Sequence, residues 1–147
     1  MARSFADLRT HLLSGQSPPH AVNGSVSYLS SRPHLEQKAA ALIAERDRRA
    51  QFFAEELFAD PAWDILLDLT LAALQQRRVT VSNLCIGAHV PQTTALRWIK
   101  MMADEGLLER QDDRLDARRK FVALAPATLK KMLAYLESID QKTGCAG

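Results

Sequence analysis

Cysteine is scarce in this chain of 147 residues, and several other features are missing with it. The two cysteines, Cys85 and Cys145, lie far apart without a CxxC spacing. This argues against a disulfide scaffold or a zinc site and fits a reducing cytoplasm. No apolar run approaches the roughly 20 residues of a membrane helix, and no apolar stretch with a cleavage site indicates a secretory signal. We therefore expect a cytoplasmic protein without membrane contact.

The chain also lacks a large excess of charge of one sign, because 19 lysines and arginines and 17 acidic residues give a net charge of only +2. A nucleic-acid-binding function must therefore rest on where the cations lie. No nucleophile–base–acid set, metal-ligand cluster or glycine-rich phosphate loop is present. The four histidines are scattered along the chain. The sequence thus predicts a protein that is not an enzyme and has neither a metal site nor a cofactor.

The apolar content, 47% of the residues, is enough for one domain with a hydrophobic core. Residues 1–32 are rich in turn and linker residues, for example over 14–19, and predict a flexible N-terminal arm. The alternative is an arm that contacts nucleic acid or a partner through Arg3, Arg9 and Arg32.

Two helices are expected after the arm. Residues 33–59 carry apolar side chains at helical spacing. This stripe could lie on the chain's own domain or on a second subunit. Asp60 as cap and Pro61 at the first position begin a second helix, which runs to about Gln76. That helix is apolar nearly all round, so we expect it, including Trp63, to lie in the core.

The stretch 90–106 organises the rest of the chain and reads as one helix, with Pro91 in its first turn and Gly106 at its end. Its inward side repeats at helical spacing and consists of Ala95, Trp98, Ile99 and Met102. The opposite side presents Gln92, Thr93, Thr94, Arg97 and Lys100. Short hydrogen-bonding groups followed by cations suit the base edges of the DNA major groove. The alternative is a solvated amphipathic helix.

A shorter helix precedes this one. Ser82 is expected to cap it, and it would run from Asn83 to about Ala88 with Cys85 on its inward side. His89 then lies in the connecting turn, where we expect turn geometry or a phosphate contact rather than catalysis. A short helix, a turn and a second helix with a polar leading face form a helix-turn-helix.

A β-hairpin is predicted next, with extended segments over 107–111 and 120–124 joined by a charged turn. Residues 109–120 contain five cations and four anions, so the hairpin is not a plain basic patch. We expect Asp113 or Asp116 to hold an arginine in place while other arginines project. A solvated hairpin laced with ion pairs is the alternative.

A last helix is expected over residues 128–140. The chain resembles winged-helix regulators of the MarR type in its order of elements, which is helix, helix-turn-helix, hairpin and helix. It also resembles them in the segments 94–108 (TALRWIKMMADEGLL) and 113–124 (DRLDARRKFVAL). The resemblance extends over residues 60–136, about half of the chain. The chain differs from many members of the family in its short C-terminal region. In addition, Cys85 does not match the position of the redox-sensing cysteine that some members carry.

The resemblance implies a mainly α fold with a small β-hairpin wing. The winged helix-turn-helix would occupy residues 60–125, flanked by dimerisation helices over 33–59 and 126–147, the latter with a short tail. It implies a homodimer that binds double-stranded DNA with its recognition helices about 34 Å apart. A small-molecule effector is a further implied partner.

The resemblance also implies which residues contact DNA. The helix over 92–104 would enter the major groove, and Arg118 or Arg119 at the wing tip would enter the adjacent minor groove. The expected base-reading residues are Gln92, Thr93, Thr94 and Arg97. Phosphates would be held by Ser82, Asn83 and Lys100, and the wing would use Arg114, Arg118, Arg119 and Lys120.

The sequence thus predicts a bacterial, homodimeric, sequence-specific regulator of transcription. The alternative is a winged helix used for protein–protein interaction or as a scaffold, without specific DNA binding. The low net charge and the near-neutral wing favour that alternative.

Overall fold

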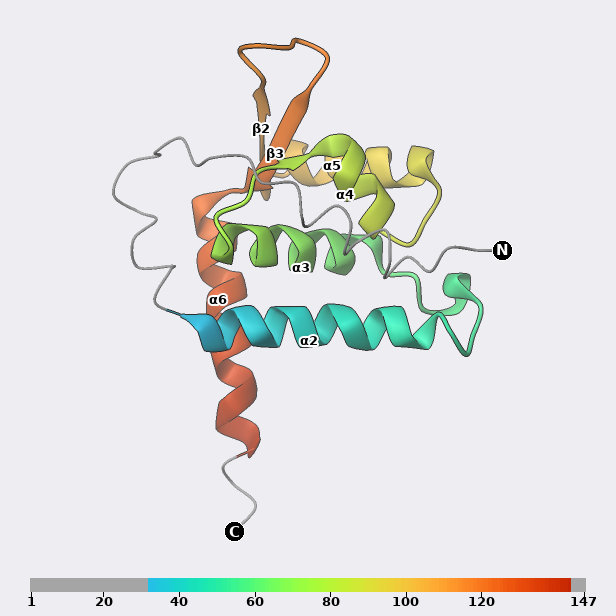
Figure 1. Cartoon of the computed structure of the whole chain (residues 1–147), viewed down its shortest axis with the longest axis vertical. Coiled ribbons are helices and arrows are strands. Elements are labelled where there is room, and N and C mark those ends of the chain that lie inside the picture. Colours follow the sequence, from blue (N-terminus) through green and yellow to red (C-terminus); the bar gives the residue numbers. More distant parts are fainter. Residues whose placement is uncertain (1–31, 144–147) are drawn as a thin grey trace.

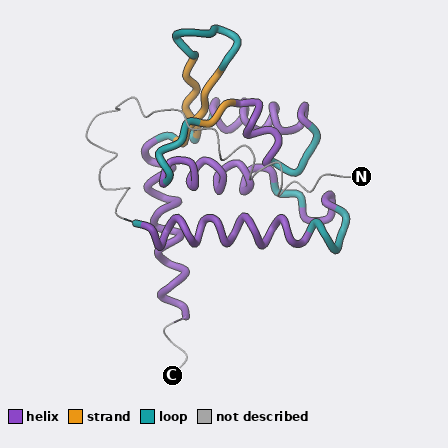
Figure 2. The backbone as a smooth tube through the Cα atoms, in the orientation of Figure 1, coloured by secondary structure: helices purple, strands orange, loops and turns teal. Residues whose placement is uncertain are grey.

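The computed structural model describes residues 32–143, so the predicted arm, except Arg32, and Cys145 lie outside the described residues. Most of this part is helical, and the strands lie together at one end (Figure 2). This confirms the predicted mainly α fold with a small β-hairpin wing. In chain order the elements are α2 (Pro33–Arg49), the 3₁₀ turn η1 (Glu55–Phe58), α3 (Pro61–Leu74), β1 (Val79–Thr80), α4 (Val81–Gly87), α5 (Gln92–Asp104), β2 (Leu108–Asp112), β3 (Lys120–Leu124) and α6 (Pro126–Thr143).

Helix α3 is the centre of the molecule, as its apolar sequence predicts. Asp60 caps it by accepting a hydrogen bond from the Trp63 backbone N–H. Helix α2 runs antiparallel along one side of α3, and α4 and α5 lie along the other (Figure 1). The apolar stripe of α2 packs within this core through Leu35, Ala39 and Ile43. Of the two surfaces expected for this stripe, its own domain or a second subunit, the structure shows the first for these three residues.

The end of α2 differs from the prediction, because the helix stops at Arg49 and does not continue to residue 59. The Arg49 carbonyl accepts turn hydrogen bonds from the Phe52 and Phe53 amides, and the backbone is extended at Ala54. Ile43 is the last buried residue of α2, and Phe53 and Leu57 further along are exposed. The apolar spacing of residues 50–59 therefore does not correspond to packing on the core.

A three-stranded antiparallel sheet in the order β1–β3–β2 carries the wing. Val122 pairs with Val79 on β1 and with Arg110 on β2. Leu108 and Leu124 are buried at the base of the hairpin, while the rest of β2 and the turn stand away from the helices (Figure 1). The predicted hairpin is confirmed, and β1 adds a third strand to it.

Helix α6 begins at Pro126 and ends at Thr143, so it is longer at both ends than the predicted 128–140. A proline is well suited to the first turn because it has no N–H to leave unsatisfied. The helix packs against α2 and α3 and then continues beyond α2 (Figure 1). Trp63 is half-buried against the core and meets Tyr135 edge to face at 5.1 Å. No helix within residues 32–143 has the length and apolar character needed to cross a membrane.

Candidate nucleic-acid interface

Helices α4 and α5 form the predicted helix-turn-helix, but the residue that caps α4 is two positions earlier in the chain than expected. The Thr80 hydroxyl, not that of Ser82, accepts a hydrogen bond at 3.2 Å from the Asn83 backbone N–H. Ser82 and Asn83 are exposed in the first turn of α4. Their side chains are therefore open to solvent at the position where phosphate contacts were predicted.

Helix α5 begins at Gln92, because Pro91 has an extended backbone (ψ 147°) and precedes the helix rather than lying in its first turn. At the other end Gly106 has φ +77°, the left-handed conformation predicted for it. Of the predicted inward residues, Ala95, Ile99 and Met102 are buried, and Trp98 is half-buried against the core. The inward side of α5 is therefore as predicted.

The outward side of α5 carries the predicted base-reading groups. Gln92, Thr93 and Arg97 are exposed, and Thr94 is half-buried. Lys100 is exposed but its ammonium group lies 2.7 Å from Asp104 of the same helix, so a phosphate contact would have to compete with this pair. The sequence analysis missed Leu96, which is also exposed on α5. Its place four residues after Gln92 was the available signal.

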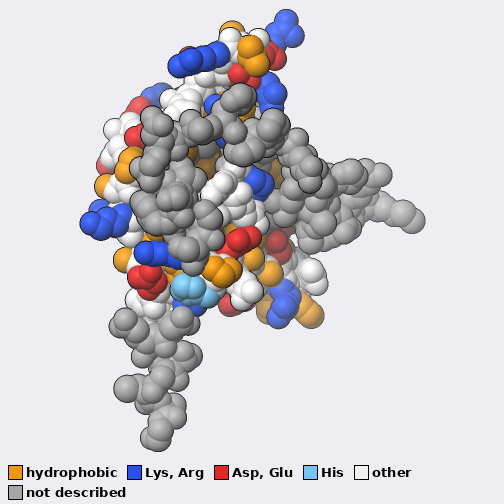
Figure 3. Space-filling view, turned by 60° about the vertical axis from the view of Figure 1, so that its left-hand side comes forward, with side chains coloured by type: hydrophobic (Ala, Val, Ile, Leu, Met, Phe, Trp, Pro, Cys, Tyr) orange, Lys and Arg blue, Asp and Glu red, His pale blue; other side chains and the backbone are white. Residues whose placement is uncertain are grey.

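The wing turn presents cations at its end. Figure 3 shows Lys and Arg side chains there, with acidic side chains between them. All the predicted wing residues are exposed, namely Arg114, Arg118, Arg119 and Lys120. Lys120 lies 3.6 Å from Asp112 across the hairpin.

The two aspartates of the turn do not hold arginines, so this expectation is wrong. Asp113 accepts a hydrogen bond from the Leu115 backbone N–H, and Asp116 accepts one from the Arg118 backbone N–H, both at 3.0 Å. Short acidic side chains at turns favour such local backbone bonds. Within the described part of the chain, Arg114 and Arg118 form no ion pair.

Sequence reasoning also missed a cationic stack at the base of the wing. The Arg78 guanidinium lies 3.7 Å from the centre of the Phe121 ring, and that of Arg119 lies 5.5 Å from it. Phe121 reaches Arg78 because Thr80 of β1 pairs with it on β3. The Arg77–Arg78 pair was visible in the sequence, but the pairing of β1 with the hairpin was not. Two guanidinium groups therefore lie beside one aromatic ring, which restricts their orientation.

His89 has the first of its two predicted roles, turn geometry, with φ +54°. Its two nitrogens lie against carboxylates, Nδ1 at 3.2 Å from Asp64 and Nε2 at 2.8 Å from Asp47. Hydrogen bonds to Asp47 and then Asp64 raise the pKa of His89 to about 9. The partners are 42 and 25 positions away, which is why no cluster was visible in the sequence.

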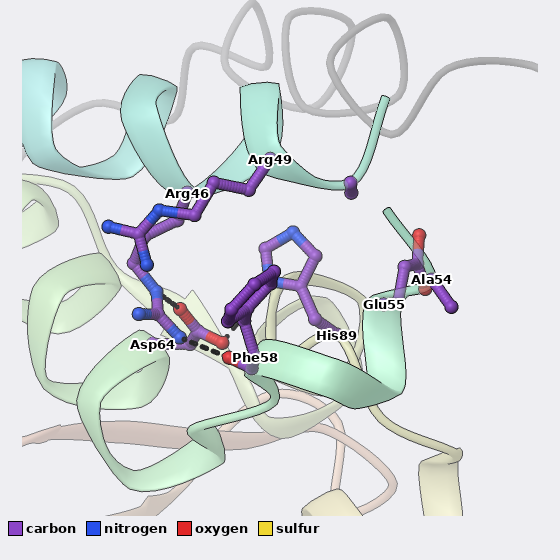
Figure 4. Close-up of a pocket in the computed structure, with 8 residues that line it drawn as sticks. Arg46, Arg49, Ala54, Glu55, Phe58, Asp64 and His89 are labelled. Carbon is purple, nitrogen blue, oxygen red and sulfur yellow. Dashed lines mark hydrogen bonds and ion pairs between the residues drawn. The ribbon is translucent and has the colours of Figure 1, made fainter. Parts of the chain in front are cut away.

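A shallow open pocket beside this histidine is lined in part by Arg46, Arg49 and Phe58 (Figure 4). Among residues 32–143, no group of three or more His, Cys, Asp or Glu is arranged to hold a metal ion. Cys85 is buried, as predicted, and burial raises the pKa of its thiol. A raised pKa lowers the thiolate fraction and so the reactivity of this cysteine.

Comparison with known proteins gives likenesses among solved structures only. No protein-family model matches the chain, and no curated protein matches it. AF1382 from Archaeoglobus fulgidus is 20% identical, with 65% of this chain and 96% of that chain covered and a TM-score of 0.47. An S. aureus MepR–DNA complex is 20% identical (81% and 87% covered, TM-score 0.48). AdcR from Streptococcus pyogenes is 19% identical (75% and 77% covered, TM-score 0.45).

MepR and AdcR are MarR-family regulators, the family that the sequence resembles. The TM-scores of these three likenesses are all below 0.5. They therefore assign no function or partner to this chain.

Proposed function

We propose that this protein is a homodimeric transcription regulator of the MarR type that binds specific sites in double-stranded DNA in the bacterial cytoplasm. The observation that carries the proposal is the outward side of α5. Its leading turns expose Gln92, Thr93 and Arg97 while its other side is anchored in the core. A helix supported from behind and polar in front has the form needed to enter a major groove about 12 Å wide.

The roles of these side chains follow from their chemistry. Arg97 can donate two hydrogen bonds to the O6 and N7 atoms of guanine, and Gln92 can bond adenine in the same bidentate way. Thr93 and Thr94 offer hydroxyl groups that both donate and accept. Leu96 adds an apolar contact for a thymine methyl group. Sequence preference in this proposal comes from these side chains together.

The wing supplies the second contact. The Asp113 and Asp116 carboxylates bond the turn backbone, so the turn keeps its shape without engaging the Arg114 and Arg118 guanidinium groups. A preformed turn with an unpaired arginine suits a narrow minor groove, whose negative potential attracts guanidinium groups. We assign Arg118 as the inserted side chain, with Arg114 on its flank.

Phosphates supply most of the affinity in this proposal. Ser82 and Asn83 at the start of α4 and Lys100 on α5 are the phosphate contacts predicted from the sequence. The proposal gives the same role to Arg119 and Lys120 on the wing. To these we add Arg78, which is exposed and held on Phe121. Cations at several phosphates make binding fall steeply with salt.

Dimerisation in this proposal uses α2 and α6. Helix α6 continues beyond the rest of the molecule (Figure 1), and Tyr135 on it is 47% exposed. A twofold dimer presents two copies of α5 to successive major grooves, about 34 Å apart, and prefers a site with inverted symmetry. A small-molecule effector that changes DNA affinity belongs to the same proposal.

Selection from a pool of random duplexes tests the proposal, with mass determination by light scattering. The expected result is an enriched inverted repeat, a mass of two chains, and an affinity that falls at least tenfold between about 50 and 200 mM salt. Binding without enrichment of any sequence would reject sequence specificity. A monomeric mass on the enriched site would reject the dimer.

One feature favours the second candidate, an interaction module without specific DNA binding. The segment after α2 exposes four large apolar side chains, Phe52, Phe53, Leu57 and Phe58. Such a patch is typical of a protein–protein interface. Retention on heparin at low salt separates the two functions, because a DNA-binding protein is retained and is released as the salt is raised, whereas an apolar interface gives no such retention.

A further inference from the structure

The turn between α4 and α5 contains a non-glycine residue in the left-handed region. His89 has φ +54°, a left-handed conformation that is uncommon for residues other than glycine, although histidine, asparagine and aspartate enter it more readily than other side chains. Such a residue persists when the surrounding contacts fix it. The turn sets where α5 begins, so whatever fixes His89 also fixes the start of that helix.

The side chain of His89 is what joins this turn to the rest of the molecule. Its Nε2 lies 2.8 Å from Asp47 of α2 and its Nδ1 lies 3.2 Å from Asp64 of α3. Both partners are carboxylates, which accept hydrogen bonds at neutral pH, so both ring nitrogens must donate. The ring is therefore an imidazolium, and one side chain connects three elements.

The surroundings are arranged to balance this charge. Asp64 is almost fully buried and also accepts a hydrogen bond from Arg46 of α2, whose guanidinium group contacts the Phe58 carbonyl as well (Figure 4). Among the described residues, Asp64 thus bonds both Arg46 and His89, and His89 also bonds Asp47. Two further charged side chains line the adjoining pocket, those of Arg49 and Glu55. The pKa of His89, raised to about 9, is consistent with an imidazolium throughout the neutral range.

We propose that His89 is a positioning residue for DNA binding, whose ring fixes the start of the recognition helix α5 on Asp47 of α2 and Asp64 of α3. The inference rests on the proposed function, because α5 is taken to be the helix that reads DNA. Loss of the ring leaves α5 packed on the core through its apolar side but lets its leading turn shift. DNA affinity depends on that turn, since Gln92 and Thr93 lie in it.

The variant His89→Asn tests the proposal, because asparagine accepts a positive φ but is too short to bridge both aspartates. Asp47→Asn is the second variant, which keeps the ring and removes one acceptor charge. His34→Asn is the matched control, since His34 is exposed on α2, and light scattering verifies that this variant has the same mass as the wild type. Fluorescence anisotropy with a duplex enriched by the wild-type protein measures affinity between pH 7.5 and 9.5.

The expected result at pH 7.5 is a loss of affinity of about tenfold in His89→Asn, a smaller loss in Asp47→Asn and none in the control. The ratio of wild-type affinity to His89→Asn affinity should be at least threefold smaller at pH 9.5 than at pH 7.5, because the imidazolium of the wild-type protein loses a proton over this range. A merely structural role would not make this ratio depend on pH. His89→Asn affinity within twofold of the wild type at pH 7.5, or a constant ratio, would overturn the proposal.

A readout without DNA keeps this inference separate from the proposed function. In a Trp63→Phe background, the emission of Trp98 reports on the surroundings of α5. We expect the Trp98 spectrum to shift between pH 7.5 and 9.5 in the protein that keeps His89 and to stay constant in the protein with His89→Asn. A wild-type protein that binds no duplex would reject the proposed function, and an unchanging Trp98 spectrum would reject the positioning of α5 by His89.

Discussion

Arg78 illustrates how a single residue depends on contacts that its sequence neighbourhood does not show. Its guanidinium group stacks on the ring of Phe121, which lies on β3, 43 positions further along the chain, and Arg119 is near the same ring. Stacking restricts the side chain before any ligand binds, so less conformational entropy is lost when it meets a phosphate. Arg78 is therefore a better phosphate contact than a freely rotating surface arginine.

The consequence is measurable as a salt dependence. Arg78→Ala is expected to weaken binding to all duplexes about equally and to lower the slope of log affinity against log salt concentration by about 1. Arg48→Ala, which removes an exposed cation from α2, is the control and should leave the slope unchanged. An unaltered slope in Arg78→Ala would show that this residue contacts no phosphate.

At the scale of elements, the join between α5 and β2 depends on Gly106. Its φ of +77° is left-handed, and an added Cβ would have no heavy atom within 4 Å. The cost of a side chain there is therefore conformational rather than steric. Gly106→Ala should lower the free energy of unfolding by about 1 kcal/mol.

Urea denaturation measures this change, and Gly106→Asn is the matched variant. Asparagine enters the left-handed region more readily than alanine, so its loss of stability should be smaller. Equal losses for the two variants would contradict a purely conformational cost at this position.

The sequence predicted those elements whose signals are local. The helix over α5 and its end were visible because Ala95, Ile99 and Met102 recur at helical spacing before a glycine. The hairpin was visible because its strands alternate on either side of a charged turn. Features that depend on tertiary contacts were missed or misplaced. The end of α2 depends on where α3 offers a surface, and neither Thr80 nor Ser82 could be preferred as cap from spacing alone.

The candidate site was predicted in the same uneven way. The outward side chains of α5 and the wing follow from local patterns, so their exposure was predicted correctly. The partners of His89 on α2 and α3, like the stacking of Arg78, arise only when distant segments meet. The aspartates of the wing turn were expected to hold arginines. Each instead accepts a hydrogen bond from the backbone amide two residues further along the chain.

At the scale of the whole molecule, the cluster around His89 makes stability depend on pH. The folded state raises the pKa of His89 from 6.5 to about 9, so between these values the folded protein binds more protons than the unfolded chain. The contribution is fully present below about pH 6.5 and is lost as the pH rises through 9. We expect the free energy of unfolding to fall by on the order of 2 kcal/mol over this window.

Urea unfolding at pH 6, 7.5 and 9.5 measures the effect, with His89→Asn as the control. The variant should be less stable than the wild type at pH 6 and should show a weaker decline with pH. A wild-type decline no steeper than that of the variant would mean that His89 is not protonated in the folded state.

The account as a whole depends on α5 being the surface that reads DNA, and the affinity of Arg97→Ala for the enriched duplex tests this most directly. Arg97 is exposed and lies outside the core, so its loss should leave the unfolding transition unchanged. The predicted result is a loss of about 1–3 kcal/mol, or about 5- to 150-fold, with relaxed preference at one base pair. Arg48→Ala should bind as the wild type does. Equal affinity of Arg97→Ala and the wild type would contradict the account.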